Sequence, residues 1–233
     1  MCFTGPAGVG KSTLISNLLP LAASNKTIAW LACDPSSPKS GGSLLGDRIR
    51  SSGKDISESI YIRSMSTRGS GAFSQSIRDV EIFLEHSFDR VWVETAGSGQ
   101  TQSEIAKISA ITVLILQPET GDDVQWMKSG VREWCDLFVI HKSDLPGADM
   151  MAKSLEEMGI SEKDILKVSS RDGRGLEILE ARIEEKLRSL NWKSRGADLH
   201  ECLAKNLFFE RETKKLEKAY AEKKRTFIRK PYG

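Results

Sequence analysis

The sequence predicts an α/β fold in which a mostly parallel sheet is flanked by helices. Three observations support this prediction. Short β-branched segments alternate with segments of helical periodicity along most of the 233 residues, which is the pattern of successive βαβ units. A glycine-rich loop follows the first such segment and opens a helix. Polar residues follow several later segments, where the carboxyl ends of parallel strands form a binding edge.

Seven strands and six helices are expected, in largely alternating order. The expected strands are Met1–Thr4, Thr27–Cys33, Ser59–Arg63, Arg90–Glu94, Ile111–Gln117, Leu137–His141 and Ile165–Ser169, and the expected helices lie near residues 11–23, 74–86, 102–109, 122–134, 148–158 and 174–190. Only four residues precede Gly5, whereas a phosphate loop normally follows a strand of about five or six residues. Either the first strand is short or the chain lacks residues that the natural protein has, and we favour a truncated or misplaced start.

The segment from Gly5 to Thr13 reads Gly-Pro-Ala-Gly-Val-Gly-Lys-Ser-Thr and matches the phosphate-loop pattern G-x-x-x-x-G-K-[ST]. Its glycines allow successive backbone N–H groups to face an anion at the start of a helix. Lys11 is expected to reach the β- and γ-phosphates, and the Ser12 hydroxyl to bind Mg²⁺. A glycine-rich turn that merely resembles the pattern is the alternative. The fold is therefore predicted to be of the P-loop NTPase type, with the nucleotide contacted by Gly5, Pro6, Ala7, Gly8, Val9, Gly10, Lys11, Ser12 and Thr13.

Residues 91–97, Val-Trp-Val-Glu-Thr-Ala-Gly, indicate a buried strand that ends in an acid shortly before a glycine. A carboxylate at this place can hold Mg²⁺, and the Gly97 N–H can bond a γ-phosphate. The alternative is that Glu94 is a strand-end residue in a surface ion pair. Gln100 is a candidate for orienting the attacking water, and Arg68 is a candidate for stabilising charge, although an exposed structural arginine fits that position as well.

Two further loops are predicted to read the base. Residues 137–144 form a strand followed by His141-Lys142-Ser143-Asp144. One carboxylate can accept the paired N1–H and N2–H₂ donors of guanine, whereas adenine would leave Asp144 unpaired. The aliphatic stem of Lys142 can cover the base plane. In the second loop, Ser169, Ser170 and Arg171 can offer backbone N–H groups to the guanine carbonyl. Together with the phosphate loop, these residues predict GTP.

Composition is that of an ordinary globular protein, with 39% hydrophobic and 28% charged residues. No apolar segment approaches the roughly 20 residues that span a bilayer, and no secretory signal is recognisable at the start. The four cysteines are scattered, as expected for reduced thiols. We expect a protein without a membrane partner that is cytoplasmic, or mitochondrial if its source is a eukaryote.

Charge and patterning divide the chain near residue 190. Residues 191–233 carry 12 Lys and Arg against 6 Asp and Glu, but their signs alternate, which favours a solvated or partner-facing helix over nucleic-acid binding. A stripe of Leu199, Leu203, Leu207 and Phe208 fits one helical face. We predict a P-loop domain at 1–190 and a C-terminal helical extension at 191–233, which either packs back on the domain or dimerises.

Residues 34–48, Asp-Pro-Ser-Ser-Pro-Lys-Ser-Gly-Gly-Ser-Leu-Leu-Gly-Asp-Arg, closely resemble a diagnostic stretch of the MeaB/ArgK family of P-loop GTPases. Residues 66–70, 94–100 and 121–128 are also similar to segments of that family. The resemblance covers roughly residues 3–175.

The resemblance implies a GTPase that converts GTP to GDP and phosphate slowly on its own. It also implies a chaperone that gates cofactor loading and protects an adenosylcobalamin-dependent acyl-CoA mutase of the methylmalonyl-CoA mutase type. The implied cofactors are GTP or GDP and Mg²⁺, and the implied assembly is a homodimer. By position, Ser12, Asp34, Asp47 and Glu94 would surround the metal, with Lys11, Glu94, Gly97 and Gln100 acting in catalysis.

The same resemblance places Asp122, Gln125 and Lys128 in a third switch that relays nucleotide state to the mutase. An exposed helix start is the alternative, because acidic residues suit a helix N-terminus by themselves.

Two positions depart from the family. His141 stands where the family has asparagine, and a neutral imidazole supplies only one donor and one acceptor. We therefore predict weaker guanine affinity with retained specificity. Gln102 stands where the family has an acidic residue, which would alter the relay in that loop.

Two other classes of function remain open. The first is a different P-loop enzyme, such as a nickel metallochaperone GTPase or a small-molecule kinase. His86, His141 and His200 lie far apart in the sequence, which disfavours the nickel version, and no segment suggests a kinase acceptor lid. The second is a nucleotide-binding module that does not hydrolyse.

Overall fold

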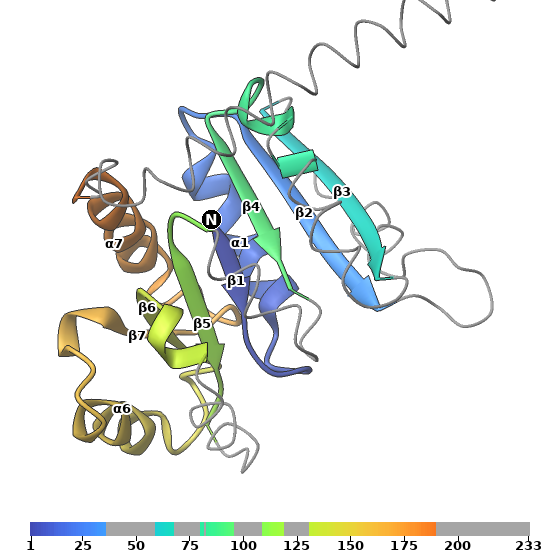
Figure 1. Cartoon of the computed structure of the whole chain (residues 1–233). Coiled ribbons are helices and arrows are strands. Elements are labelled where there is room, and N and C mark those ends of the chain that lie inside the picture. The colour runs from blue at the N-terminus through green and yellow to red at the C-terminus, as the bar shows by residue number, and fades with distance from the viewer. Residues whose placement is uncertain (36–58, 68–79, 82, 96–108, 119–130, 190–233) are drawn as a thin grey trace, which may run out of the picture. The chain divides into compact units, whose positions relative to one another are not determined.

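The computed structural model describes residues 1–35, 59–67, 80–81, 83–95, 109–118 and 131–189 (Figure 1). The chain divides into two compact units, Met1–Ser189 and Leu190–Gly233. The second unit lies outside the described residues, so the helical extension and its stripe of Leu199, Leu203, Leu207 and Phe208 remain predictions.

Seven strands form one sheet in the order β3-β2-β4-β1-β5-β6-β7 (Figure 1). Every neighbouring pair is parallel, which confirms the predicted α/β fold and all seven predicted strands. The strands are β1 (Cys2–Thr4), β2 (Ile28–Pro35), β3 (Ile60–Thr67), β4 (Arg90–Glu94), β5 (Thr112–Leu116), β6 (Leu137–His141) and β7 (Ile165–Val168).

Three α-helices are described with their bounds: α1 (Lys11–Ala22), α6 (Ala148–Glu157) and α7 (Leu176–Ser189). They confirm the helices predicted near 11–23, 148–158 and 174–190. Residues 80–81 and 83–85 are helical within the prediction for 74–86. Of the prediction for 122–134, only η1 (Val131–Trp134) is described, and it is a 3₁₀ turn; a second 3₁₀ turn, η2, covers Glu162–Asp164. Of the helix predicted near 102–109, residues 102–108 lie outside the described residues, so this helix stays a prediction.

The strands that flank the phosphate loop are buried along their length, as expected for a parallel sheet covered on both faces. Every residue of β1, β5 and β6 is buried. On one face Leu84 packs against Leu31 and Val93. Elsewhere Leu155 of α6 packs against Leu114 and Ile140. These clusters hold the strand ends in fixed relative positions.

The carboxyl ends of β4, β1, β5 and β6 are consecutive along one edge of the sheet. Phe3 of β1 is level with Glu94, the last residue of β4. Leu116 of β5 is level with Ile140 of β6. The loops that follow these four strands therefore meet at one edge, as in other open parallel sheets.

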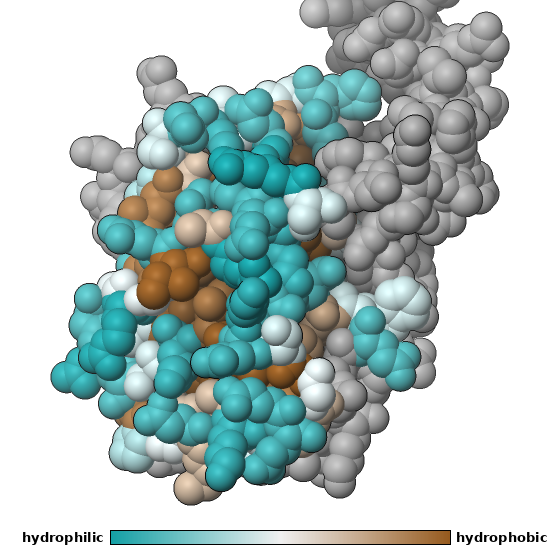
Figure 2. Space-filling model, turned by 90° about the vertical axis from the view of Figure 1, so that its left-hand side faces the viewer, coloured by the Kyte–Doolittle hydropathy of each residue, from teal (hydrophilic) through white to brown (hydrophobic). Residues whose placement is uncertain are grey.

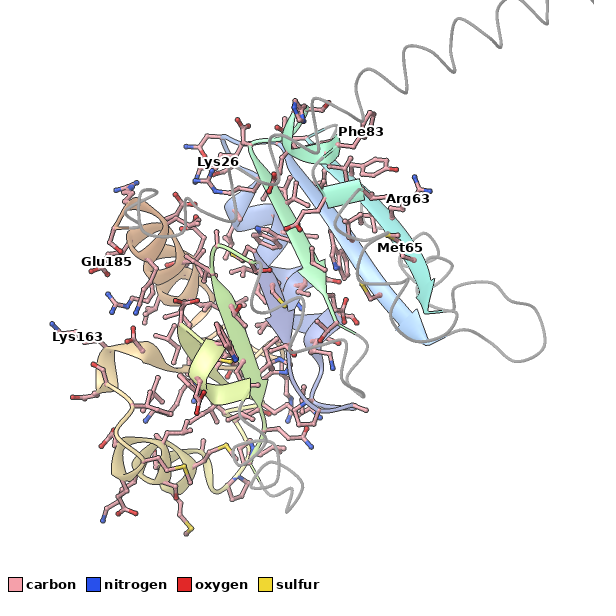
Figure 3. The ribbon with its side chains drawn as sticks, viewed as in Figure 1. Lys26, Arg63, Met65, Phe83, Lys163 and Glu185 are labelled. Carbon is pink, nitrogen blue, oxygen red and sulfur yellow. The ribbon has the colours of Figure 1, made fainter. Side chains whose placement is uncertain are left out.

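The two sides of the described sheet differ in the side chains that Figure 3 labels. Arg63 and Met65 lie on the outermost strand β3, whereas Lys163 of η2 and Glu185 of α7 lie on the other side (Figure 3). A charged residue such as Arg63 on an outermost strand is typical of edges that avoid pairing with other chains. Figure 2 shows the α7 side, where hydrophilic residues predominate and hydrophobic ones form small groups. Among the described residues, none of the helices has the length and apolar character needed to cross a bilayer.

Candidate nucleotide-binding site

The phosphate loop leaves β1 through a position that only glycine can occupy. Gly5 has φ 148°, and a Cβ there would lie 2.1 Å from the Ile115 carbonyl oxygen on the neighbouring strand. Gly8 and Gly10 also have positive φ, at 81° and 90°, which side chains disfavour. The loop then enters α1, whose first residue is Lys11. The predicted loop-to-helix geometry is therefore present.

The Lys11 ammonium is folded over its own loop. Nζ donates to the carbonyl oxygens of Gly5 at 2.9 Å and Pro6 at 2.8 Å. Lys11 is buried, and this burial lowers the pKa of its ammonium, while the charge of Glu94 acts in the opposite direction. Because both present acceptors are neutral, an entering phosphate would be the stronger partner for this cation.

Ser12 and Glu94 meet although 82 residues separate them in the chain. The Ser12 hydroxyl donates to Glu94 Oε1 at 2.5 Å. Glu94 is only 4% exposed, which does not fit the alternative of a surface ion pair. Thr95 keeps the ends of β4 and β1 together, because its N–H donates to the Phe3 carbonyl and its hydroxyl to Thr4.

Hydroxyl and carboxylate oxygens are the ligands that Mg²⁺ prefers, and this ion usually keeps several waters and phosphate oxygens as its other ligands. Ser12 and Glu94 fit such a partial ligand set. Within the described ranges, no group of three or more His, Cys, Asp or Glu gathers as a dedicated protein cage. The backbone of Asp34 lies in β2 two residues beyond Ala32, which is level with Glu94. Asp47 lies outside the described residues.

His141 joins the phosphate loop to the loop after β7. Its Nδ1–H donates to the Val9 carbonyl oxygen at 2.7 Å, and its Nε2 accepts from the Ser170 hydroxyl at 2.8 Å. This tautomer follows because a carbonyl can only accept. His141 is 2% exposed, and burial lowers the pKa of its imidazole. The one donor and one acceptor expected of this residue are thus both in use; the predicted weaker guanine affinity stays a prediction.

Lys142 also reaches the phosphate loop. Its Nζ donates to the Gly8 carbonyl oxygen at 3.1 Å and to Gln117 Oε1 at 2.6 Å. Its backbone has φ 57°, which is costly for a residue with a side chain. The sequence analysis did not identify Gln117 as a site residue. The signal that could have found it is its position directly after β5, a buried strand between β1 and β6.

Asp144 lies beside the loop that follows β7. The Ser169 hydroxyl donates to Asp144 Oδ1 at 2.8 Å, and Arg171 Nη1 lies 3.8 Å from Oδ2. The hydrogen bond from Ser169 holds the pKa of this carboxyl below its ordinary value. Asp144 is therefore ionised at neutral pH and is an acceptor, as guanine recognition requires.

The structure thus brings the phosphate loop together with Glu94 and joins it to both predicted base-reading loops through His141 and Lys142. Several residues predicted to act here lie outside the described residues, so their roles stay predictions. They are Asp47, Arg68, Gly97, Gln100, Gln102, Asp122, Gln125 and Lys128.

Comparison with known proteins gives a family match. The family model described as "Methylmalonyl Co-A mutase-associated GTPase MeaB" matches residues 1–223. The mouse protein named methylmalonic aciduria type A homolog, mitochondrial, is 33% identical over 187 residues, which are 74% of this chain and 45% of its own. GTPase ArgK of Escherichia coli K12 is 38% identical over 144 residues, which are 60% of this chain and 44% of its own.

A relative from Pyrococcus horikoshii that carries a GTPase name is 44% identical over 150 residues, covering 63% of this chain and 47% of its own. The chain therefore spans about half the length of the curated relatives it matches.

Two solved structures share the fold. A crystal structure described as a LAO/AO transport system kinase has a TM-score of 0.61 at 23% identity and covers 92% of this chain and 67% of its own. HypB from Helicobacter pylori, in complex with nickel, has a TM-score of 0.60 at 20% identity and covers 80% of this chain and 86% of its own. At these identities the likeness concerns the fold alone.

Proposed function

Because the chain belongs to the MeaB family of methylmalonyl-CoA mutase-associated GTPases, we propose that it binds GTP with Mg²⁺ and hydrolyses it slowly to GDP and phosphate. We further propose that it is a chaperone that gates cofactor loading and protection of an adenosylcobalamin-dependent acyl-CoA mutase.

The observation that carries the nucleotide part is the connection between the phosphate loop and the base-reading loops. His141 bonds Val9 of the phosphate loop and Ser170 of the last loop. Asp144 accepts from Ser169, the neighbour of Ser170. An ionised carboxylate in a loop that is joined to the phosphate loop through His141 and Lys142 suits the paired donors of guanine and would be left unpaired by adenine.

Hydrolysis in this proposal depends on positioning and on neutralising charge, which dominate phosphoryl transfer. Lys11 would transfer its hydrogen bonds from the loop carbonyls to the β- and γ-phosphates. Ser12 and Glu94, with Asp34 and Asp47, would hold Mg²⁺, which supplies further charge neutralisation when bound. Gly97 would donate its N–H to the γ-phosphate, and Gln100 would orient water.

The proposed partner is supported by the family description, which names a methylmalonyl-CoA mutase-associated GTPase, and by the name of the mouse relative, methylmalonic aciduria type A homolog. The proposed assembly rests on what the family resemblance implies. We propose a homodimer formed through residues 191–233 and a cytoplasmic location, or a mitochondrial one if the source is a eukaryote. The fold likeness to HypB gives no support for the nickel alternative, because it concerns architecture alone.

Calorimetric titration with GTP, GDP and ATP in the presence of Mg²⁺ tests the nucleotide part. We expect guanine nucleotides to bind at least about 100-fold more tightly than ATP, as for sites that hydrogen-bond a specific group. Lys11→Ala should abolish binding. Asp144→Asn should shift the preference to xanthosine nucleotides, because an amide can donate to the xanthine 2-carbonyl. Equal affinity for GTP and ATP would contradict the proposal.

Phosphate release with and without an adenosylcobalamin-dependent mutase tests the rest. The isolated chain should turn over slowly, and the mutase should accelerate it. Fast release by the isolated chain would contradict the slow intrinsic rate. Guanine binding without any phosphate release would favour the non-hydrolysing module instead.

A further inference from the structure

We propose that Gln117 is a positioning residue for guanine recognition, because it holds Lys142 where the lysine stem would cover the purine. The inference rests on the proposed function, in which the site binds guanine nucleotides. It adds a residue that neither the phosphate-loop motif nor the base-reading motif includes.

The contact itself is short. Gln117 Oε1 accepts from Lys142 Nζ at 2.6 Å, whereas the second acceptor of Nζ, the Gly8 carbonyl oxygen, lies at 3.1 Å. A lysine side chain has four rotatable bonds, so the path of its aliphatic stem depends on where its ammonium is held. Two acceptors on different loops together limit the positions that the side chain can take.

The backbone of Gln117 is anchored by the sheet. It directly follows β5, which is buried throughout and pairs with β1 on one side and β6 on the other (Figure 1). Gly8 is an exposed phosphate-loop residue, and a Cβ built on it would meet nothing within 4 Å. The sheet therefore sets the distance between Gln117 and the residue that follows β6.

Lys142 is that residue, and its backbone is held in an unfavourable conformation. A φ of 57° in a residue with a side chain persists only where the surroundings impose it. Leu116 and Ile140 are level in the adjacent strands β5 and β6, so Gln117 and Lys142 leave the sheet close together. The strained backbone aims the lysine back toward β5 and the phosphate loop.

The acceptor is also neutral, which suits a site for anions. An amide oxygen holds the ammonium without cancelling its charge, whereas a carboxylate would neutralise it and repel phosphates. Gln117 thus supplies geometry and leaves the positive charge of Lys142 available to the nucleotide.

A double-mutant cycle tests the proposal. The variants are Gln117→Leu, Lys142→Met and the pair together, and the measurement is the Kd of GDP and of GTP by calorimetry. Freeing one side chain of this kind should weaken both nucleotides equally, by about 3- to 10-fold. If Gln117 acts through the ammonium, Gln117→Leu has no further effect in the Lys142→Met background. If the fold-changes in Kd of the two single variants multiply in the double variant, the two residues act independently and the inference is overturned.

Two further variants separate positioning from packing. Gln117→Glu keeps the length and an acceptor for Lys142 Nζ, but its negative charge should weaken GDP binding by repelling the phosphates. Gln117→Asn, which is shorter by one methylene, should lose affinity as Gln117→Leu does; unchanged affinity in Gln117→Asn would overturn the inference. Thermal unfolding of each variant identifies any loss of folding. If the wild-type chain binds no guanine nucleotide, the proposed function is refuted together with this inference. If the chain binds GTP but the effects of Gln117→Leu and Lys142→Met on Kd multiply, only this inference is refuted.

Discussion

Gly10→Ala should disrupt the connection between the phosphate loop and His141, and Gly8→Ala is its matched control. Both glycines have a positive φ, 90° for Gly10 and 81° for Gly8. A Cβ on Gly10 would lie 2.7 Å from His141 Cε1 and 2.8 Å from Nδ1, whereas a Cβ on Gly8 would meet nothing within 4 Å. The two variants therefore share the backbone strain and differ in the overlap with the imidazole.

The expected magnitudes follow from these contacts. A left-handed backbone costs a residue with a side chain about 1–2 kcal/mol, and both variants carry this cost. In Gly10→Ala the imidazole must also leave the Val9 carbonyl and the Ser170 hydroxyl. Breaking a buried hydrogen bond in this way costs about 1–3 kcal/mol. Gly10→Ala should thus be less stable than Gly8→Ala by about 1–3 kcal/mol, or about 2–12 °C in Tm for a chain of this size.

Urea unfolding of the nucleotide-free chain measures the difference. A third variant, Gly10→Ala with His141→Ala, removes the ring that the new methyl group would meet. Its loss of unfolding free energy should be smaller than the sum of the two single losses. Equal losses in Gly10→Ala and Gly8→Ala would show that the imidazole yields freely and would refute the reasoning.

Three further outcomes are expected. Burial lowers the pKa of His141 below its ordinary value near 6.5. The stability that its neutral form provides is therefore complete above about pH 6.5 and is lost as the pH falls through the folded-state pKa. Urea unfolding at a series of pH values should show this decline in the free energy of unfolding, and His141→Asn should flatten it. Gly175→Ala should lower the free energy of unfolding by about 1–3 kcal/mol more than Gly173→Ala does. Both glycines have a φ near 77°, but only at Gly175 would a Cβ lie 2.2 Å from a backbone carbonyl oxygen of β7. Equal Tm values for the two variants would contradict this. On α1, Leu18→Ala should cost about 2–5 kcal/mol, because Leu18 is fully buried, whereas Leu21→Ala, 38% exposed, should cost about 1 kcal/mol or less; scanning calorimetry compares them.

Local patterning predicted where most elements lie. β4 and β6 have the bounds that were expected, Arg90–Glu94 and Leu137–His141, because compact apolar runs bounded by polar residues are visible in the chain. β2 and β3 extend further than expected, to Pro35 and Thr67. These two residues pair with each other in the final register, and a pairing between distant segments leaves no trace in the periodicity of either one.

In the candidate site, too, some residues could be predicted from local patterns and others could not. The residue types at the phosphate loop, at Glu94 and at Asp144 were recognisable because each lies at or just after the end of a strand, in a short motif. The contact of Lys142 with Gln117 was not, because a glutamine after an apolar run has no distinctive spacing.

The order of residues along the chain alone determined an α/β fold, a phosphate loop and the polar groups that follow its strands. The tertiary structure decided which of those groups meet. Ser12 contacts Glu94, and His141 contacts Val9, only because β4, β1, β5 and β6 are consecutive in the sheet. Strand order depends on hydrogen bonds and packing between segments up to 134 residues apart, and local propensity carries no information about it.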